Sequence, residues 1–449
     1  MKKIIETIKN IWRIEDLRTR LLITILFVAI YRFGSFIVLP GIDPARLQAL
    51  QNQTSEGLMS LLNMFSGGAF SNASVFALGI MPYISASIVI QLLAIAVPYF
   101  QKMQREGESG RRKINQITRW LTIAILLFQA PSYLINLKAQ TAGSGAFLVG
   151  DGFWFMLSST IILAAGSMFV LWLGERITDK GVGNGVSLII MIGIIARMPS
   201  AFVAEFVTAF SGAEGGGLIK FLFEIIALLF VMALAIMLVK ATRKVPVQYA
   251  KRVEGSKQLG GARQYIPLKL FAANVMPIIF AQAIMFIPLT IVSSTADANS
   301  SGFWMSFRDH TSVPYNIVLV VLIIAFTYFY TAITLNPVQM AEDMKRNNGF
   351  IPGVKPGKPT ADYLDTVMSR ILLPGSLFIS IIAILPAFAG VFGVSQGFAQ
   401  FFGGTSLLIL VGVVLDTLQQ IESHLLVRRY DGLLNSGHVR SHSSNISAY

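Results

Sequence analysis

The chain has 449 residues, of which 54% are apolar and only 13% charged, and its mean hydropathy is +0.64. This composition excludes a soluble globular protein and indicates a protein that crosses the membrane several times. The chain contains no cysteine, which excludes disulfide bonds and thiolate metal sites. Its formal charge of +13 is compatible with nucleic acid or anionic lipid as a partner.

About 20 apolar residues are needed to cross a bilayer as a helix, and a window of that length finds ten such segments. They lie near residues 21–40, 75–97, 117–137, 153–174, 183–208, 218–240, 270–292, 315–337, 368–390 and 404–426. The basic N-terminal segment is followed by no small-residue cleavage site, so we expect the first apolar segment to be retained. Ten is an even number, which places both termini on the same side.

Lysine and arginine concentrate in the N-terminal segment and in every second connection, at residues 98–116, 175–182, 241–269 and 338–367. The opposite connections hold little beyond Arg46, Lys138 and Arg308. The positive-inside rule therefore predicts that both termini are cytoplasmic. Topology alone explains most of the net positive charge.

The stretch 65–93 departs from the uniform apolarity of a membrane span. Its first half is built from small and polar residues, namely Ser66, Gly67, Gly68, Ser71, Asn72 and Ser74, and it reads as a bilayer-length helix only from Val75. Irregular backbone at membrane depth is tolerated only beside protein or a water-filled cavity. We therefore predict a pore, with the polar half as its plug and the apolar half as part of its lining.

Two cytoplasmic connections are longer than the topology requires. The first, 241–269, contains the predicted strand VPVQYA and a Gly-Gly turn, and the second, 336–367, contains four prolines, a short helix and the tip FIPGVKPGKP. Long loops of this kind are more often binding surfaces than spacers. Their basic residues favour RNA or an acidic protein as the partner.

Catalytic chemistry finds no support in the sequence. The histidines are scattered, and GVGNG at 181–185 lacks the preceding strand and the following lysine of a phosphate-binding loop, so we interpret it as a tight turn between helices. Arg32, Glu224 and Asp416 are charged residues within predicted spans, a feature of ion-coupled transporters. Pairing between helices is the alternative explanation for these three residues.

Spans one to five and six to ten form two halves, 1–217 and 218–427, followed by a tail at 428–449. Because five is odd, the second half enters the membrane from the other side, and the halves form an inverted repeat. Aliphatic side chains lie at mid-membrane in four of the spans. Ile80 and Ile84 share one helix face, as do Val186 and Ile190, while Ile279 and Ile409 lie at comparable depth. They are candidates for a pore lining or for ordinary core.

Several strings resemble the SecY family of bacterial protein translocase channel subunits, in the family's order and spacing. They include FALGIMPYISASIVIQLL, GESGRRKINQITRW, GERITDKGVGNGVSLII, GFIPGVKPGKPTADYLD and FGGTSLLILVGVVLD. The resemblance covers essentially all ten segments. It implies an all-helical membrane protein of ten spans, with two inverted five-helix halves around an hourglass-shaped pore that also opens sideways between spans two and seven.

The resemblance also implies roles for individual residues. The constriction ring would be formed by Ile80, Ile84, Val186, Ile190, Ile279 and Ile409, and the plug would span about residues 61–74, including Phe65, Ser66, Gly67, Gly68, Ser71 and Asn72. Docking of the ribosome and of the SecA ATPase would use Arg243, Lys244, Lys251, Arg252, Lys345, Arg346, Lys355 and Lys358. Many family members carry arginine where Lys355 stands, and lysine keeps the charge but lacks the bidentate fork.

The family further implies SecE and SecG as membrane partners, and signal sequences and unfolded secretory proteins as substrates. Anionic lipids remain candidate partners for the basic surface. The expected setting is the bacterial plasma membrane, with no cofactor, no metal and no catalytic site. Energy would come from SecA, the ribosome or the proton-motive force. Two alternatives stay open at this stage: an ion-coupled secondary transporter, and a platform that docks ribosomes without conducting a polypeptide.

Overall fold

The computed structural model describes most of the chain. The described residues are 14–47, 65–141, 152–211, 217–249, 263–270, 276–282, 312–399 and 404–436, with short pieces at 12, 63, 147, 252–254, 257–259, 284–285 and 401. Long helices dominate this part. They are α2 (Glu15–Gly34), α5 (Met81–Ala96), α6 (Pro98–Arg105), α7 (Glu108–Gln140), α8 (Phe153–Lys180), α9 (Gly185–Ser211), α10 (Gly217–Lys240), α13 (Val313–Thr334), α14 (Pro337–Arg346), α15 (Lys358–Val391), α16 (Gln396–Ala399) and α17 (Gly404–Ser436), with a 3-10 turn at Pro44–Leu47.

Seven helices of the described part are long and apolar enough to cross a membrane, and an eighth span results if the bent pair α5 and α6 is counted as one. Together they match eight of the predicted segments and confirm a polytopic helical membrane protein. The first predicted segment, 21–40, overlaps helix α2, which ends at Gly34 and carries the charged residues Glu15, Asp16, Arg18, Arg20 and Arg32. The seventh, 270–292, lies mostly outside the described residues and is helical at 276–282 and 284–285.

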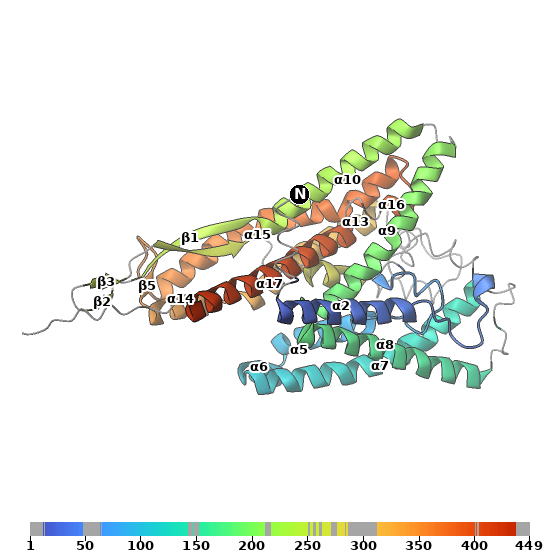
Figure 1. Ribbon diagram of the computed structural model, residues 1–449, viewed down its shortest axis with the longest axis horizontal. Coiled ribbons are helices and arrows are strands. Elements are labelled where there is room, and N and C mark those ends of the chain that lie inside the picture. The colour runs from blue at the N-terminus through green and yellow to red at the C-terminus, as the bar shows by residue number, and fades with distance from the viewer. Residues whose placement is uncertain are drawn as a thin grey trace, which may run out of the picture.

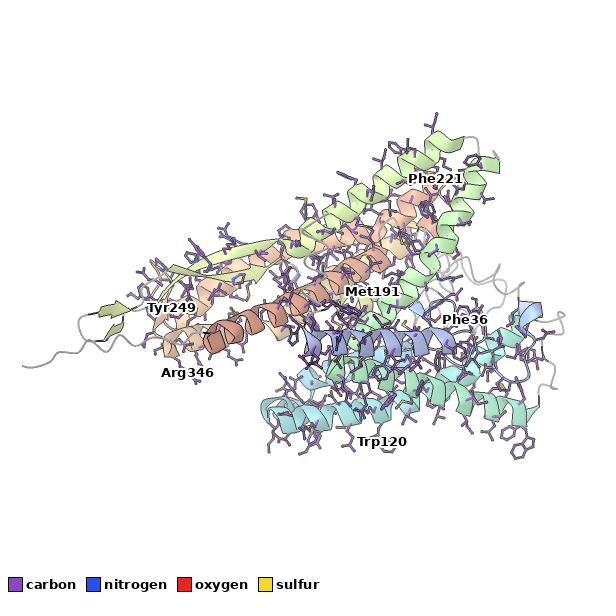
Figure 2. The ribbon with its side chains drawn as sticks, viewed as in Figure 1. Phe36, Trp120, Met191, Phe221, Tyr249 and Arg346 are labelled. Atoms are coloured by element: carbon purple, nitrogen blue, oxygen red, sulfur yellow. The ribbon has the colours of Figure 1, made fainter. Side chains whose placement is uncertain are left out.

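Figure 1 shows the arrangement of these helices. The N-terminal helices α2, α5, α6, α7 and α8 form the lower part of the view, and α10, α13, α15 and α17 form the upper part. Helix α9 crosses between the two parts, packing against α2 and α8 on one side and against α10, α16 and α17 on the other. Large apolar side chains cover the outside, such as Trp120 on α7, which projects from the lower edge in Figure 2. Such a surface suits lipid.

The predicted helix from Val75 is wrong in its first turns. Residues 75–80 form turns, and helix α5 begins only at Met81. Gly79 has a φ of +52°, a left-handed conformation that interrupts a helix, and Pro82 then occupies the first turn, where its missing N–H costs nothing. Proline also ends the helix, because Val97, the residue before Pro98, is extended and cannot continue it. The chain bends there by 101° into α6.

The two long connections meet in one antiparallel sheet of three strands, in the order β4, β1, β5. Strand β1 (Thr242–Tyr249) pairs with β4 (Arg263–Lys269) along its length, and its last residues pair with β5 (Gly349–Phe350) from the second connection. The predicted strand VPVQYA is confirmed at residues 245–249, and its last residue, Ala250, lies outside the described residues. Two short strands, β2 (Arg252–Glu254) and β3 (Lys257–Leu259), form a separate hairpin beyond it.

A small hydrophobic core fixes this sheet to the helices. Val245 and Val247 of β1 are almost fully buried against Met344 of α14 and against Leu364 and Met368 of α15. Helix α15 begins at Lys358, ten residues earlier than the predicted span, so its first turns support the sheet. Helix α17 likewise continues to Ser436, past residue 428, where we placed the start of the tail.

Candidate functional site: the aliphatic ring and the polar plug

The six candidate ring residues come from four distant parts of the chain. Ile80 and Ile84 lie at the start of α5, Val186 and Ile190 in the first turns of α9, Ile279 in the helical piece 276–282, and Ile409 in α17. Ile80 is the residue before α5, but the Ile84 N–H still donates to the Ile80 carbonyl oxygen at 3.1 Å, so the two stay one turn apart.

Four of the six ring candidates, Ile80, Ile84, Ile190 and Ile409, are buried members of the largest hydrophobic core. Ile84 is 8% exposed, Ile409 is 1% exposed, and Ile80 and Ile190 lie between these values. Val186 and Ile279 are partly buried and pack against the same core. The plug residues Phe65 and Ala69 are also members of it. Phe70 and Ala73 of the predicted plug belong instead to a second core, with Tyr133 of α7, so only part of the predicted plug shares a core with the ring candidates.

Side chains of α2 contact the predicted plug segment. The Arg32 Nη1 donates to the Gly67 carbonyl oxygen at 2.9 Å, and the Tyr31 hydroxyl donates to the Ser66 carbonyl oxygen at 3.3 Å. Gly67 has a φ of +64°, and a Cβ there would lie 2.7 Å from Arg32 Nη1 and 3.0 Å from the Cα of Gly193 in α9. Only glycine fits this approach.

The plug also folds on itself and against α7. The Ser71 N–H donates to Asn63 Oδ1 at 3.1 Å, and the Phe70 N–H donates to Ser66 Oγ at 3.0 Å. From α7, the Tyr133 hydroxyl donates to the Phe70 carbonyl oxygen at 2.9 Å. These bonds satisfy backbone groups that would otherwise be unpaired in an apolar region, where each costs free energy. The polar residues of this stretch thus allow irregular backbone at that depth.

The sequence drew attention to Arg32 but gave no signal for Tyr31 or Tyr133 as residues that contact the plug. Arg32 stands near the middle of the predicted segment 21–40, but it lies in the last turn of α2 because that helix ends at Gly34. Its guanidinium is also 5.2 Å from the centre of the Phe36 ring, a cation–π contact. The residue is thus paired within the protein.

A second cluster of polar side chains lies near the end of α9 and the start of α10. Buried Glu205 of α9 accepts hydrogen bonds from the hydroxyl and the N–H of Ser395, which lies between α15 and α16. Lys220 of α10 donates to the Gly393 carbonyl oxygen at 2.6 Å and lies 3.9 Å from the carboxylate of Glu224. The charged residues Arg32 and Glu224 therefore have partners within the protein, which favours the structural explanation for them.

The candidate docking residues lie on the joined loops and on the helices beside them. Six of them are exposed: Arg243, Lys244, Lys345, Arg346, Lys355 and Lys358. Tyr249 at the end of β1 and Arg346 of α14 lie at the left of Figure 2, away from Met191 of α9. Arg252 is part of β2, but its side chain and the whole of Lys251 lie outside the described residues.

Within the described part of the chain, no group of three histidine, aspartate or glutamate residues is arranged to hold a metal ion. His438 and His442 lie outside that part. The site consists of aliphatic side chains, hydrogen-bonded turns and a basic surface.

Comparison with known proteins assigns the family. The sequence model of the SecY family matches residues 74–418. The protein translocase subunit SecY of Streptomyces coelicolor is 42% identical over 434 residues, which cover 94% of this chain and 98% of that protein. The chain belongs to the SecY family. The SecY subunit of Chlamydia trachomatis is 39% identical over 449 residues, covering 95% of this chain and 98% of that protein.

Solved structures agree on the fold of this SecY family member. A structure described as a protein conducting channel superposes with a TM-score of 0.60 at 18% identity, covering 90% of this chain and 92% of that chain. Sec61 in a canine ribosome–channel complex superposes with a TM-score of 0.56 at 17% identity and the same coverage. Membership of the SecY family confirms the predicted resemblance and overturns the alternative of an ion-coupled transporter.

Proposed function

We propose that this SecY family chain forms the protein-conducting pore of the general secretory (Sec) translocon. The observation that carries the proposal concerns ring candidates that are far apart in sequence. Ile80, Ile84, Ile190 and Ile409 are buried in the same core as Phe65 and Ala69 of the predicted plug, and Val186 and Ile279 pack against that core. In this proposal the idle pore is closed at the ring, and the plug segment covers the ring from the external side.

An aliphatic throat suits a channel that must pass every kind of side chain. Such a ring offers no specific hydrogen bonds, closes around any extended polypeptide, and excludes ions by dewetting. The plug is displaced when a substrate enters. Its side-chain hydrogen bonds from Tyr31, Arg32 and Tyr133 to backbone carbonyl oxygens can be exchanged for water, so that displacement is reversible.

Membrane proteins leave sideways, between spans two and seven. Each leucine, isoleucine, phenylalanine or valine contributes about −0.3 to −0.6 kcal/mol at the centre of the bilayer, so a sufficiently apolar segment partitions into lipid. In this proposal the chain provides access and the bilayer selects the segment. The halves 1–217 and 218–427 part to open this route.

The partners act at opposite surfaces. SecA or a ribosome docks on the joined cytoplasmic loops, where six exposed basic residues and the rigid three-stranded sheet support the proposal. SecE and SecG associate within the bacterial plasma membrane, anionic lipids contact the basic surface, and both termini are cytoplasmic. Energy for translocation comes from SecA, from the ribosome or from the proton-motive force.

A site-specific crosslink tests the pore. The chain contains no cysteine, so a single cysteine at Ile279 reacts without background against a cysteine in a stalled secretory substrate. We expect an adduct that depends on the substrate. A cysteine at exposed Lys355 is the matched control for docking. Adducts at Lys355 without any at Ile279 would mean that the chain docks partners without conducting them.

A further inference from the structure

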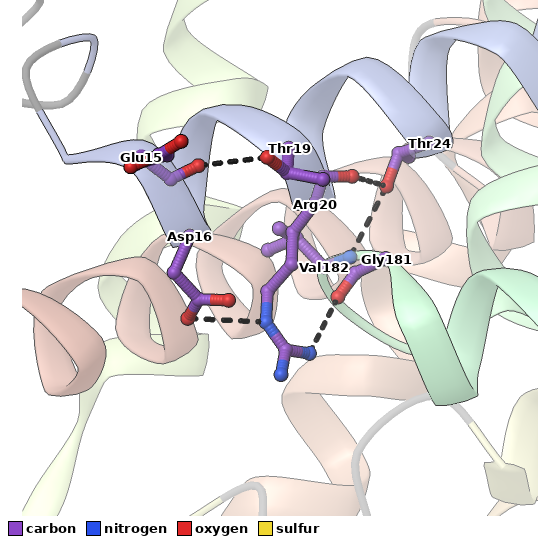
Figure 3. Close-up of polar contacts among 7 residues, drawn as sticks. All are labelled: Glu15, Asp16, Thr19, Arg20, Thr24, Gly181 and Val182. Atoms are coloured by element: carbon purple, nitrogen blue, oxygen red, sulfur yellow. Dashed lines mark hydrogen bonds and ion pairs between the residues drawn. The ribbon is translucent and has the colours of Figure 1, made fainter.

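The turn at residues 181–184, between α8 and α9, is bonded to α2 on one side (Figure 3). The Val182 N–H donates to Thr24 Oγ1 at 3.1 Å, and the Arg20 guanidinium donates to the Gly181 carbonyl oxygen at 3.5 Å. Thr24 in turn donates to the carbonyl oxygen of Arg20 at 2.9 Å. These contacts hold the turn to other elements of the first half of the chain.

The other side of the turn contacts α17, the last helix of the second half. The Gly183 N–H donates to Gln420 Oε1 at 3.0 Å. Gly183 is buried with a φ of +83°, and a Cβ there would lie 3.0 Å from Thr417 Oγ1. The absence of a side chain at this position lets the backbone of the turn approach α17.

The same turn sets the start of α9 and therefore the position of two ring candidates. The Gly185 N–H donates to Thr178 Oγ1 at 2.9 Å, and the Ser187 N–H donates to the side chain of Asn184 at 3.3 Å. Side-chain acceptors of this kind fix the first turn of a helix. Val186 and Ile190 follow within the next six residues.

Helix α17 carries a third ring candidate. Ile409 precedes Gln420 by 11 residues, which corresponds to about 17 Å along the helix. The Gly183–Gln420 hydrogen bond therefore joins two helices that both carry ring residues, one from each half. This hydrogen bond breaks when α17 moves away from α9, whereas Thr24 and Arg20 keep the turn bonded to α2 of the first half.

We propose that the Gly183–Gln420 hydrogen bond is an interlock that favours the closed ring by tying α9 to α17. The inference rests on the proposed pore function and adds a gating residue to it. Gln420 is exposed, so the Gly183 N–H and the Gln420 Oε1 both bind water once the halves part. The hydrogen bond between them therefore stabilises the closed state alone. A net hydrogen bond of this kind shifts an equilibrium by a factor of about five.

Halide efflux from proteoliposomes that contain the full-length chain tests the interlock. We expect Gln420→Ala to raise the idle leak about fivefold. Gln420→Glu keeps an oxygen acceptor for the Gly183 N–H and leaves the leak at the wild-type rate. Gln419→Ala is the matched control, because this neighbouring glutamine contacts Lys269 Nζ at 3.4 Å instead of the turn.

Ile409→Asn serves as the positive control for the pore itself. A leak in Ile409→Asn together with a wild-type rate in Gln420→Ala would overturn the interlock and leave the pore proposal intact. No leak in either variant would overturn the pore proposal. Equal leaks in Gln420→Ala, Gln420→Glu and Gln419→Ala would also overturn the interlock, because the effect would then not depend on the acceptor.

Discussion

Replacing Arg32 by methionine tests how the plug is held. Methionine keeps an unbranched side chain of similar reach but removes the hydrogen bond of 2.9 Å from the guanidinium to the Gly67 carbonyl oxygen. A hydrogen bond with a charged donor contributes about 1.5 to 3 kcal/mol. Because Arg32 is only partly buried, we take the lower value, about 1.5 kcal/mol, which corresponds to an increase of about tenfold in the displaced plug.

Thiol labelling measures that population. Ser71 in the plug is 2% exposed, so a cysteine at this position reacts with a water-soluble maleimide only when the plug moves. In the Ser71→Cys background we expect Arg32→Met to raise the labelling rate about tenfold. Phe36→Leu is the control, since it removes the aromatic ring 5.2 Å from the guanidinium but keeps the hydrogen bond, and it should raise the rate about two- to fivefold. An unchanged labelling rate in a stably folded Arg32→Met protein would refute the reasoning.

Three further substitutions probe the frame around the pore. Gly185→Ala places a Cβ 1.9 Å from a carbonyl oxygen of α8. Overpacking of this kind costs about 1 to 3 kcal/mol, so we expect the melting temperature of the protein to fall. Gly152→Ala is the control and should leave the melting temperature unchanged, because a Cβ at Gly152 has no atom within 4 Å. Arg119→Gln breaks a bidentate ion pair with Glu175, whose two hydrogen bonds are 3.0 and 2.7 Å long. Both side chains are partly exposed, so a double-mutant cycle should give a coupling energy of less than about 1 kcal/mol. That coupling energy should fall as the salt concentration rises. Val247→Ala truncates a fully buried side chain of β1, and we expect protease to cleave the three-stranded sheet faster while the membrane helices stay resistant. An equal increase in the cleavage of the sheet and of the membrane helices would argue against a separate core under the sheet.

Hydropathy predicted the membrane spans well because it measures what lipid requires of a helix surface. It failed at residues 75–80, where apolar side chains accompany a backbone that turns at Gly79 and begins its helix only at Met81. Side-chain apolarity says nothing about φ, and the glycine and proline signals were the better guide there.

Contacts between residues far apart in the chain could not be predicted from the sequence. Strand β5 has only two residues, Gly349 and Phe350, and it pairs with a strand about a hundred residues earlier. Nothing local marks such a strand. The same holds for Gln420 in the middle of α17, because its polar side chain attracts no attention until the turn at Gly183 is placed against it. The aliphatic ring candidates were selected by the resemblance, since isoleucine at mid-membrane is ordinary in any span.

The length of α15 has a mechanical consequence. Its 34 residues extend for about 51 Å, some 20 Å more than the hydrocarbon thickness of a bilayer. Its first turns carry Leu364 and Met368, which lie in the core beneath the sheet, so the sheet is mounted on a helix and not on a flexible tether. Pro374 and Pro386 lie farther along this helix, where each removes one backbone hydrogen bond. In the proposed function, a partner that pushes sideways on the sheet tilts this helix as a lever. A tilt of about 5° moves the far end of an unbent helix of this length by about 4 Å, on the scale of a side chain, and so would carry a displacement from the sheet into the membrane.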